Sequence, residues 1–163
     1  MSKPFYYAVL ITGFLVGTLD ALAAILNFIV PVIRNPVIIF RYIASGLFGK
    51  SAYSDGVIMP LTGLLFHYFI ATAWTLLFFA AYPRLSWLRK NKIMVGIAYG
   101  IVVWLAMNLM VVPLSLAAQF PFRPLQAAVG MAILIVVVGL PISIRAHRYF
   151  SNRDLTNYEN YFE

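Results

Sequence analysis

The stretch from Gly13 to Asn27, GFLVGTLDALAAILN, decides the fold class because it is long, apolar and interrupted by one acid, Asp20. Small and polar residues recur in it at alternating spacings of four and three, and they are Gly13, Gly17, Asp20, Ala24 and Asn27. Such spacings place these residues on one face of a helix. The stretch therefore predicts a membrane-spanning helix with one closely packing face that carries a carboxylate.

The composition of the whole chain supports a membrane protein. Of the 163 residues, 63% are hydrophobic and only 10% are charged, whereas roughly a quarter of the residues of a soluble domain are charged. Because one crossing takes about 20 apolar residues, the length suits one bundle of a few spans. We therefore predict an all-α polytopic membrane protein, with a single domain over residues 1–150 and a flexible cytoplasmic tail over residues 151–163.

Four apolar segments are long enough to cross a bilayer, at about residues 6–30, 58–81, 93–112 and 125–144. The segment at residues 37–48 is too short to cross, and Pro36 before it predicts a short helix that is interfacial or re-entrant. A cleavable signal peptide is the rival interpretation of the first segment, since residues 21–23 resemble a cleavage site. Because the apolar run continues to residue 30, we favour a retained helix.

Lysine and arginine are distributed unequally over the two sides that four crossings define. With both termini inside, eight lie on the inner side, namely Lys3, Arg84, Arg89, Lys90, Lys92, Arg145, Arg148 and Arg153. The outer side has four, namely Arg34, Arg41, Lys50 and Arg123. By the positive-inside rule, both termini are therefore predicted to be cytoplasmic. We assign the net charge of +7 to span ends and anionic lipid head groups, and not to nucleic-acid binding.

Three polar residues inside the spans share a depth in the membrane. At 1.5 Å per helical residue, Asp20, His67 and Asn108 lie about 10 to 15 Å from the outer ends of their spans. A carboxylate at that level costs at least about 2.5 kcal/mol. Protonation of Asp20, pairing with a charged His67, or contact with Arg41 would each offset that cost, and all three stay open. For Arg41 itself, a side chain that extends to the lipid head groups is favoured over one that turns inward toward Asp20.

The functional interpretation is strongest for Asp20, because acids inside membranes are rare and usually serve ion paths, ligand sites or proton relays. His67 fits a proton-handling site and a structural hydrogen bond about equally, and Asn108 fits a structural role better. The tryptophans suit packing or interfacial anchoring, and they are Trp74, Trp87 and Trp104. The candidate site therefore centres on Asp20.

Two glycine pairs have the spacing that lets transmembrane helices approach closely, namely Gly13 with Gly17 and Gly96 with Gly100. We interpret both as packing within the bundle, in preference to a dedicated dimer interface. The chain has no cysteine, so thiolate metal sites and disulfides are excluded. Acids are also too few for two-metal chemistry. We predict no metal and no cofactor.

Five stretches of the chain carry a resemblance to known proteins, and they are Gly13-x-x-x-Gly17-Thr-Leu-Asp20-Ala, Arg41 to Ala52, Gly63-Leu-Leu-Phe-His67, Met107-Asn108 and Val112-Pro-Leu-Ser115. Together they resemble a group of uncharacterised bacterial four-helix inner-membrane proteins, and more distantly the YagU-like proteins. The resemblance implies a location in the bacterial cytoplasmic membrane and implies no established activity.

The sequence thus predicts a membrane protein that handles a proton, an ion or a small solute at an intramembrane polar site. The alternative is a structural or accessory subunit without catalysis, whose glycine faces bind a partner membrane protein. An intramembrane enzyme acting on lipid ranks last, because a nucleophile and metal ligands are missing. We expect contact with membrane lipids, and a homo-oligomer or a membrane-protein partner would suit a bundle that has little room for a pore.

Overall fold

The computed structural model describes residues 4–29, 35–54, 56–118, 121 and 123–159, and its regular elements within these ranges are helical. In chain order the elements are α1 (Phe5–Ile29), α2 (Val37–Phe48), η1 (Gly49–Tyr53), α3 (Ile58–Ala81), η2 (Ser86–Arg89), α4 (Lys92–Ala106), η3 (Met107–Val111), α5 (Val112–Leu114), α6 (Pro124–Leu134), η4 (Ile135–Gly139) and α7 (Leu140–Glu159). Elements η1 and η2 are short 3₁₀ helices, whereas η3 and η4 are π-helical.

Four helical segments are long and apolar enough to cross a membrane, and they are Phe5–Asn27, Ile58–Ala81, Lys92–Leu114 and Pro124–Asn152. They confirm the predicted all-α polytopic architecture. The short predicted helix at residues 37–48 is α2, which has 12 residues. Residue 30, where the first predicted span ends, lies outside the described residues.

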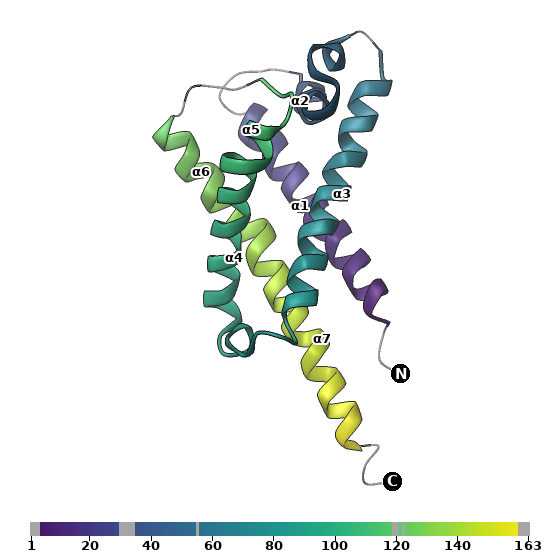
Figure 1. Ribbon diagram of the computed structural model, residues 1–163, viewed down its shortest axis with the longest axis vertical. Coiled ribbons are helices and arrows are strands. Elements are labelled where there is room, and N and C mark those ends of the chain that lie inside the picture. The colour runs from purple at the N-terminus through teal and green to yellow at the C-terminus, as the bar shows by residue number, and fades with distance from the viewer. Residues whose placement is uncertain (1–3, 30–34, 55, 119–120, 122, 160–163) are drawn as a thin grey trace.

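The elements divide between two ends of the bundle (Figure 1). At one end lie α2 and η1, together with the last turns of α1 and the starts of α3 and α6. At the opposite end lie the start of α1 and the end of α7. These are named the α2 end and the α7 end below. The sequence prediction assigns the α2 end to the outer side of the membrane.

Helices α1 and α3 cross and pack along each other. A Cβ atom on Gly13 would lie 2.8 Å from the Cα atom of Thr72, and one on Gly17 would lie 2.8 Å from the ring of Tyr68. Both distances are shorter than Cβ atoms tolerate. The absence of a side chain at each glycine therefore allows the two backbones to approach.

The second glycine pair lies between α4 and the fourth span. A Cβ atom on Gly96 would lie 2.9 Å from the Cα atom of Leu140, and one on Gly100 would lie 2.5 Å from the Cα atom of Ile135. Gly139 faces both glycines from the other helix. The two predicted packing faces are therefore occupied within the bundle.

The third and fourth spans each contain a π-helical segment close to a proline. Element η3 ends two residues before Pro113, and η4 ends two residues before Pro141. Proline lacks a backbone N–H, and its ring collides with the carbonyl four residues earlier, so a regular α-helix cannot continue through that turn. A π-helical turn accommodates the missing bond.

Helix α2 is tied to the chain that follows α5. The backbone N–H of Leu116 donates to the carbonyl of Gly46 at 2.9 Å, and the hydroxyl of Tyr42 donates to the carbonyl of Ala118 at 3.2 Å. Helix α2 also packs against α3, where Gly63 lies directly against the backbone of α2. The short helix is thus a fixed part of the bundle's α2 end.

The fourth span continues well beyond residue 144, where the sequence prediction ends it. Helix α7 runs to Glu159, so the backbone stays helical into the segment that was predicted as a flexible tail. The first half of α7 contacts α1 and the residue that follows α3. The Nε atom of Arg145 donates to Thr12 Oγ1 at 3.0 Å, and His147 Nδ1 lies 2.9 Å from the hydroxyl of Tyr82. Tertiary contacts therefore extend this helix where hydropathy alone predicts its end.

Candidate functional site

A cavity of about 1230 Å³ lies between the spans and reaches the α2 end. Its lining includes Asp20 from α1, His67 from α3 and Asn108 from η3. The structure thus brings together the three residues that the sequence places at one depth. Arg41, the fourth candidate, is not part of the lining.

The cavity is bounded toward the α7 end by three small apolar side chains. Val16, Val103 and Val138 line it, and each is at least 95% buried. Below them the bundle is closed by the glycine contacts between α4 and the fourth span and by ring contacts such as the stacked pair of Tyr82 and Phe150. The cavity therefore occupies the α2 half of the bundle, with a packed core beneath it.

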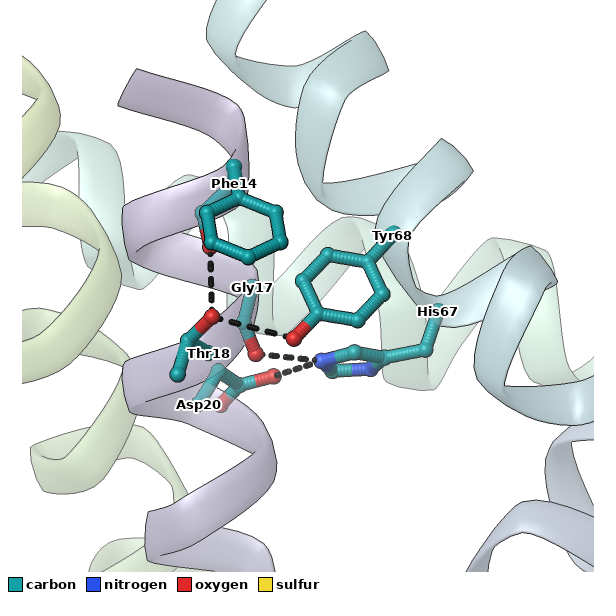
Figure 2. A network of polar contacts seen from close by, with 6 residues as sticks. All are labelled: Phe14, Gly17, Thr18, Asp20, His67 and Tyr68. Atoms are coloured by element: carbon teal, nitrogen blue, oxygen red, sulfur yellow. Dashed lines mark hydrogen bonds and ion pairs between the residues drawn. The ribbon is translucent and has the colours of Figure 1, made fainter. Parts of the chain in front are cut away.

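His67 reaches from α3 to the backbone of α1 (Figure 2). Its Nε2 atom donates a hydrogen bond to the carbonyl oxygen of Gly17 at 2.8 Å. The same nitrogen lies 4.0 Å from Asp20 Oδ2, which is longer than a hydrogen bond. Because a carbonyl oxygen only accepts, Nε2 carries a proton in this arrangement. The hydrogen bond of His67 is therefore made to Gly17, and its contact with Asp20 is electrostatic.

The carboxylate of Asp20 accepts no hydrogen bond from the described residues, and its ion-pair contact among them is with His67. Its side chain is 26% exposed and lines the cavity. A carboxylate inside a membrane span loses much of its hydration. Without a hydrogen-bond donor, no new interaction offsets that loss. A proton or a bound cation at Asp20 would offset that cost.

A second contact between α1 and α3 lies beside His67 (Figure 2). Thr18 Oγ1 donates to the carbonyl of Phe14 at 2.9 Å and lies 3.0 Å from the hydroxyl of Tyr68. Since the proton of Thr18 is used on Phe14, Tyr68 is the donor of the second bond. The rings of Phe14 and Tyr68 also stack, with centroids 5.2 Å apart. These contacts fix the register that places His67 opposite Gly17.

Asn108 lies in the cavity wall but is not hydrogen-bonded to the other two candidates. Its Nδ2 atom donates to the carbonyl of Trp104 at 2.9 Å, one turn earlier on the same helix. Its position in η3 is notable because π-helical turns occur frequently at functional sites. Asn108 therefore contributes a polar group to the cavity without joining the contact between Asp20 and His67.

Arg41 does not turn toward Asp20, and the hypothesis of a contact between them is wrong. Its Nη1 atom donates to the carbonyl of Tyr53 at 3.2 Å, and its Nη2 atom donates to the carbonyl of Gly56 at 3.1 Å. The turn between α2 and α3 leaves carbonyl groups without helical partners, and a guanidinium presents several donors in one plane. Arg41 closes this turn instead of bringing its charge into the bundle.

Replacing Arg41 with glutamine is expected to loosen the turn between α2 and α3. The variant loses two charge-assisted hydrogen bonds, partly exposed and worth roughly 1–2 kcal/mol together, so opening of the turn becomes about tenfold more frequent. Trypsin cleavage after Lys50, which lies in η1, is the measurement. Cleavage after Lys90 near the α7 end serves as the internal control and keeps its rate. Unchanged cleavage after Lys50 would contradict this role of Arg41.

The cavity lining also includes residues to which the sequence assigns other roles or none, and they are Tyr42, Trp74, Trp104, Ser115, Arg123 and Gln126. Helical spacing indicates that two tryptophans share a helix face with candidate residues, since Trp74 follows His67 by seven residues and Trp104 precedes Asn108 by four. Burial, and then the neighbouring Tyr53, raise the pKa of Tyr42, so its hydroxyl stays neutral. Residue spacing does not predict that α2 or the start of α6 lines this cavity.

Comparisons with known proteins assign no function to the site. No protein-family profile, no curated protein and no solved structure matches the chain. Over the part of the chain that the structure describes, no group of three or more His, Asp or Glu side chains could hold a metal ion. The chemistry of the site therefore rests on one acid, one imidazole and the walls of the cavity.

Proposed function

We propose that the protein binds a proton at Asp20 and exchanges it across the membrane through the cavity, as part of the movement of a small solute. One observation carries the proposal: an intramembrane acid that accepts no hydrogen bond from the described residues lines the same cavity as His67. Intramembrane acids that face a cavity commonly serve as proton relays or ligand sites. A purely structural acid would instead be expected to have a hydrogen-bonding partner.

His67 is suited to sense the state of Asp20. Its Nε2 atom lies 4.0 Å from Asp20 Oδ2 while it is hydrogen-bonded to Gly17. At that distance a positive charge on His67 and a negative charge on Asp20 attract each other, so the charge of one side chain affects the other. Because Asp20 lies on α1 and His67 on α3, this attraction depends on the relative position of the two helices.

The two π-helical segments supply places where the bundle can bend. Asn108 of η3 and Val138 of η4 both line the cavity. Since π-helical turns and prolines interrupt the regular hydrogen-bond ladder, helices bend there most easily. Bending at η4 would move Val138, which lies in the packed floor of the cavity. This provides a route by which Asp20 gains access to the other side.

We place the protein in the bacterial cytoplasmic membrane, with both termini in the cytoplasm and the cavity on the outer side. The excess of lysine and arginine near the α7 end supports this orientation. The alternative of an accessory subunit has less support, because the glycine pairs that would bind a partner pack within the bundle.

Proton flux into liposomes tests the proposal. We expect purified protein to dissipate an imposed pH gradient, read with an entrapped pH-sensitive dye, faster than protein-free liposomes. Asp20→Asn is expected to lower the protein-dependent rate at least about tenfold, because an amide does not take up a proton in this pH range.

Asp154→Asn is the matched acid-to-amide control, because residue 154 belongs to the last part of α7, far along the chain from the cavity. It is expected to keep the wild-type rate. A wild-type rate equal to that of empty liposomes, or an equal rate for Asp20→Asn, would overturn the proposal.

A further inference from the structure

We infer that the solute is an organic cation with an apolar body, which exchanges with the proton on Asp20. This inference rests on the proposed function of the same cavity and names its substrate class. Three features of the lining carry it: the charges, the aromatic side chains and the scarcity of oxygen ligands.

The charges in the lining favour a cation at the level of Asp20. Among the described residues that line the cavity, Asp20 is the only acid. Among the described residues of the lining, the one permanent cation is Arg123, an exposed residue just before α6 at the α2 end, where water screens its charge. A positively charged ligand group would therefore meet a desolvated carboxylate in the cavity and a screened guanidinium only at the rim.

Aromatic side chains contribute to the wall of the cavity. Trp74 and Trp104 line it, as does Phe66. The faces of such rings attract cations, and indole does so most strongly. The ring of Trp104 lies against α6, where a Cβ atom on Gly130 would lie 3.3 Å from its Nε1 atom. A glycine at that position therefore leaves space for the indole in the wall.

The same lining is poorly suited to a divalent metal cation or to an anion. Metal cations such as Ca²⁺ take six to eight oxygen ligands, and a hydrated Mg²⁺ is usually bound through one or two carboxylates together with substrate phosphates. Here one carboxylate is accompanied by a few neutral groups, among them Asn108, Ser115 and Gln126. An anion would be repelled by Asp20. An organic cation loses little hydration in an apolar cavity and needs one counter-charge.

Exchange with a proton follows from the sharing of one carboxylate. When the cation binds, the O–H bond of a protonated Asp20 breaks and the proton leaves to water, and protonation of Asp20 reverses the step. Among the described residues that line the cavity with Asp20, the other ionisable groups are His67 from α3, which lies 4.0 Å from the Asp20 carboxylate, Tyr42 from α2 and Arg123 before α6. The third span contributes the neutral Asn108, and Arg145 of α7 is hydrogen-bonded to Thr12 about two turns away.

A pair of probes with one shape and opposite charge tests the inference. Equilibrium dialysis of detergent-solubilised protein is carried out with tetraphenylphosphonium and separately with tetraphenylborate, and empty micelles serve as the blank. We expect saturable binding of the phosphonium, tighter at alkaline than at acidic pH, and weak or no binding of the borate. Asp20→Asn is expected to weaken phosphonium binding at least about tenfold, or about 1.4 kcal/mol, and to remove most of its pH dependence.

Two tryptophan substitutions provide a second test, which does not involve a change at Asp20. Trp104→Ala is expected to weaken phosphonium binding about three- to tenfold, because it removes an aromatic face from the wall. Trp87→Ala is the matched control, since Trp87 lies in η2, is 52% exposed and is not part of the lining. It should bind the phosphonium as the wild type does.

The outcomes separate this inference from the proposed function. Equal binding of both probes, or phosphonium binding that is unchanged in Asp20→Asn and Trp104→Ala, overturns the inference. Proton flux that depends on Asp20 without phosphonium binding also overturns it, and leaves the proposed function standing. Phosphonium binding that depends on Asp20 without any proton flux upholds the ligand class and overturns proton exchange.

Discussion

Replacing Gly100 with alanine is expected to destabilise the bundle by about 1 to 2 kcal/mol. The added Cβ atom would lie 2.5 Å from the Cα atom of Ile135, which belongs to a backbone and cannot rotate away. Overpacking of this kind costs roughly 1–3 kcal/mol or more, and the gain of about 1 kcal/mol in helix propensity recovers only part of it. Denaturation of the detergent-solubilised protein, followed by circular dichroism, measures the change.

Gly46→Ala is the matched control for this substitution. Gly46 is also helical, but a Cβ atom there would meet its nearest neighbour, the side chain of Ser115, at 3.6 Å, which is an ordinary contact. We expect this variant to be as stable as the wild type or more stable by up to about 1 kcal/mol. Equal losses in the two variants would show that close packing at Gly100 does not stabilise the bundle.

Replacing Thr12 with valine is expected to cost about 2 kcal/mol. Thr12 is 1% exposed, and its hydroxyl accepts the hydrogen bond of Arg145 Nε at 3.0 Å. Valine keeps the shape of the side chain but removes the acceptor, which leaves a charged donor without its bond between α1 and α7. Losing one partner of such a bond costs roughly 1–3 kcal/mol. Thermal unfolding in detergent is the measurement.

Thr62→Val provides the comparison for Thr12. The hydroxyl of Thr62 donates to the carbonyl of Ile58 on its own helix, and that carbonyl keeps its place in the backbone ladder when the hydroxyl is removed. The expected loss is below about 0.5 kcal/mol. A loss for Thr12→Val no greater than this would contradict the role of the bond to Arg145.

The helices were predictable because the bilayer sets their length and composition. Uninterrupted apolar segments indicated the four spans, and Pro36 indicated the start of α2. The continuation of α7 beyond residue 144 was not predictable, because Arg145 and His147 make their contacts with Thr12 and Tyr82, which lie far away in the sequence. Hydropathy indicates where a helix leaves the apolar part of the membrane. It does not indicate whether contacts with other helices stabilise the helix beyond that point.

The candidate site was predictable in depth but not in its contacts. Counting 1.5 Å per residue placed Asp20, His67 and Asn108 at one level, and they line one cavity. The partner of His67 turned out to be the carbonyl of Gly17, a backbone group that residue types do not reveal. Arg41 was wrongly allowed a contact with Asp20, because the carbonyl groups of the turn that bind it cannot be read from side chains.

By itself, the sequence determined that this chain is a four-span helical membrane protein with an acid inside its first span. Periodicity and hydropathy are local properties, so they specify elements and depths. Only the tertiary structure decided that Asp20 lines a cavity and accepts no hydrogen bond from the described residues, and that both glycine pairs are occupied within the bundle. Those facts depend on the rotation and crossing of each helix, which arise from close contacts between residues far apart in the chain.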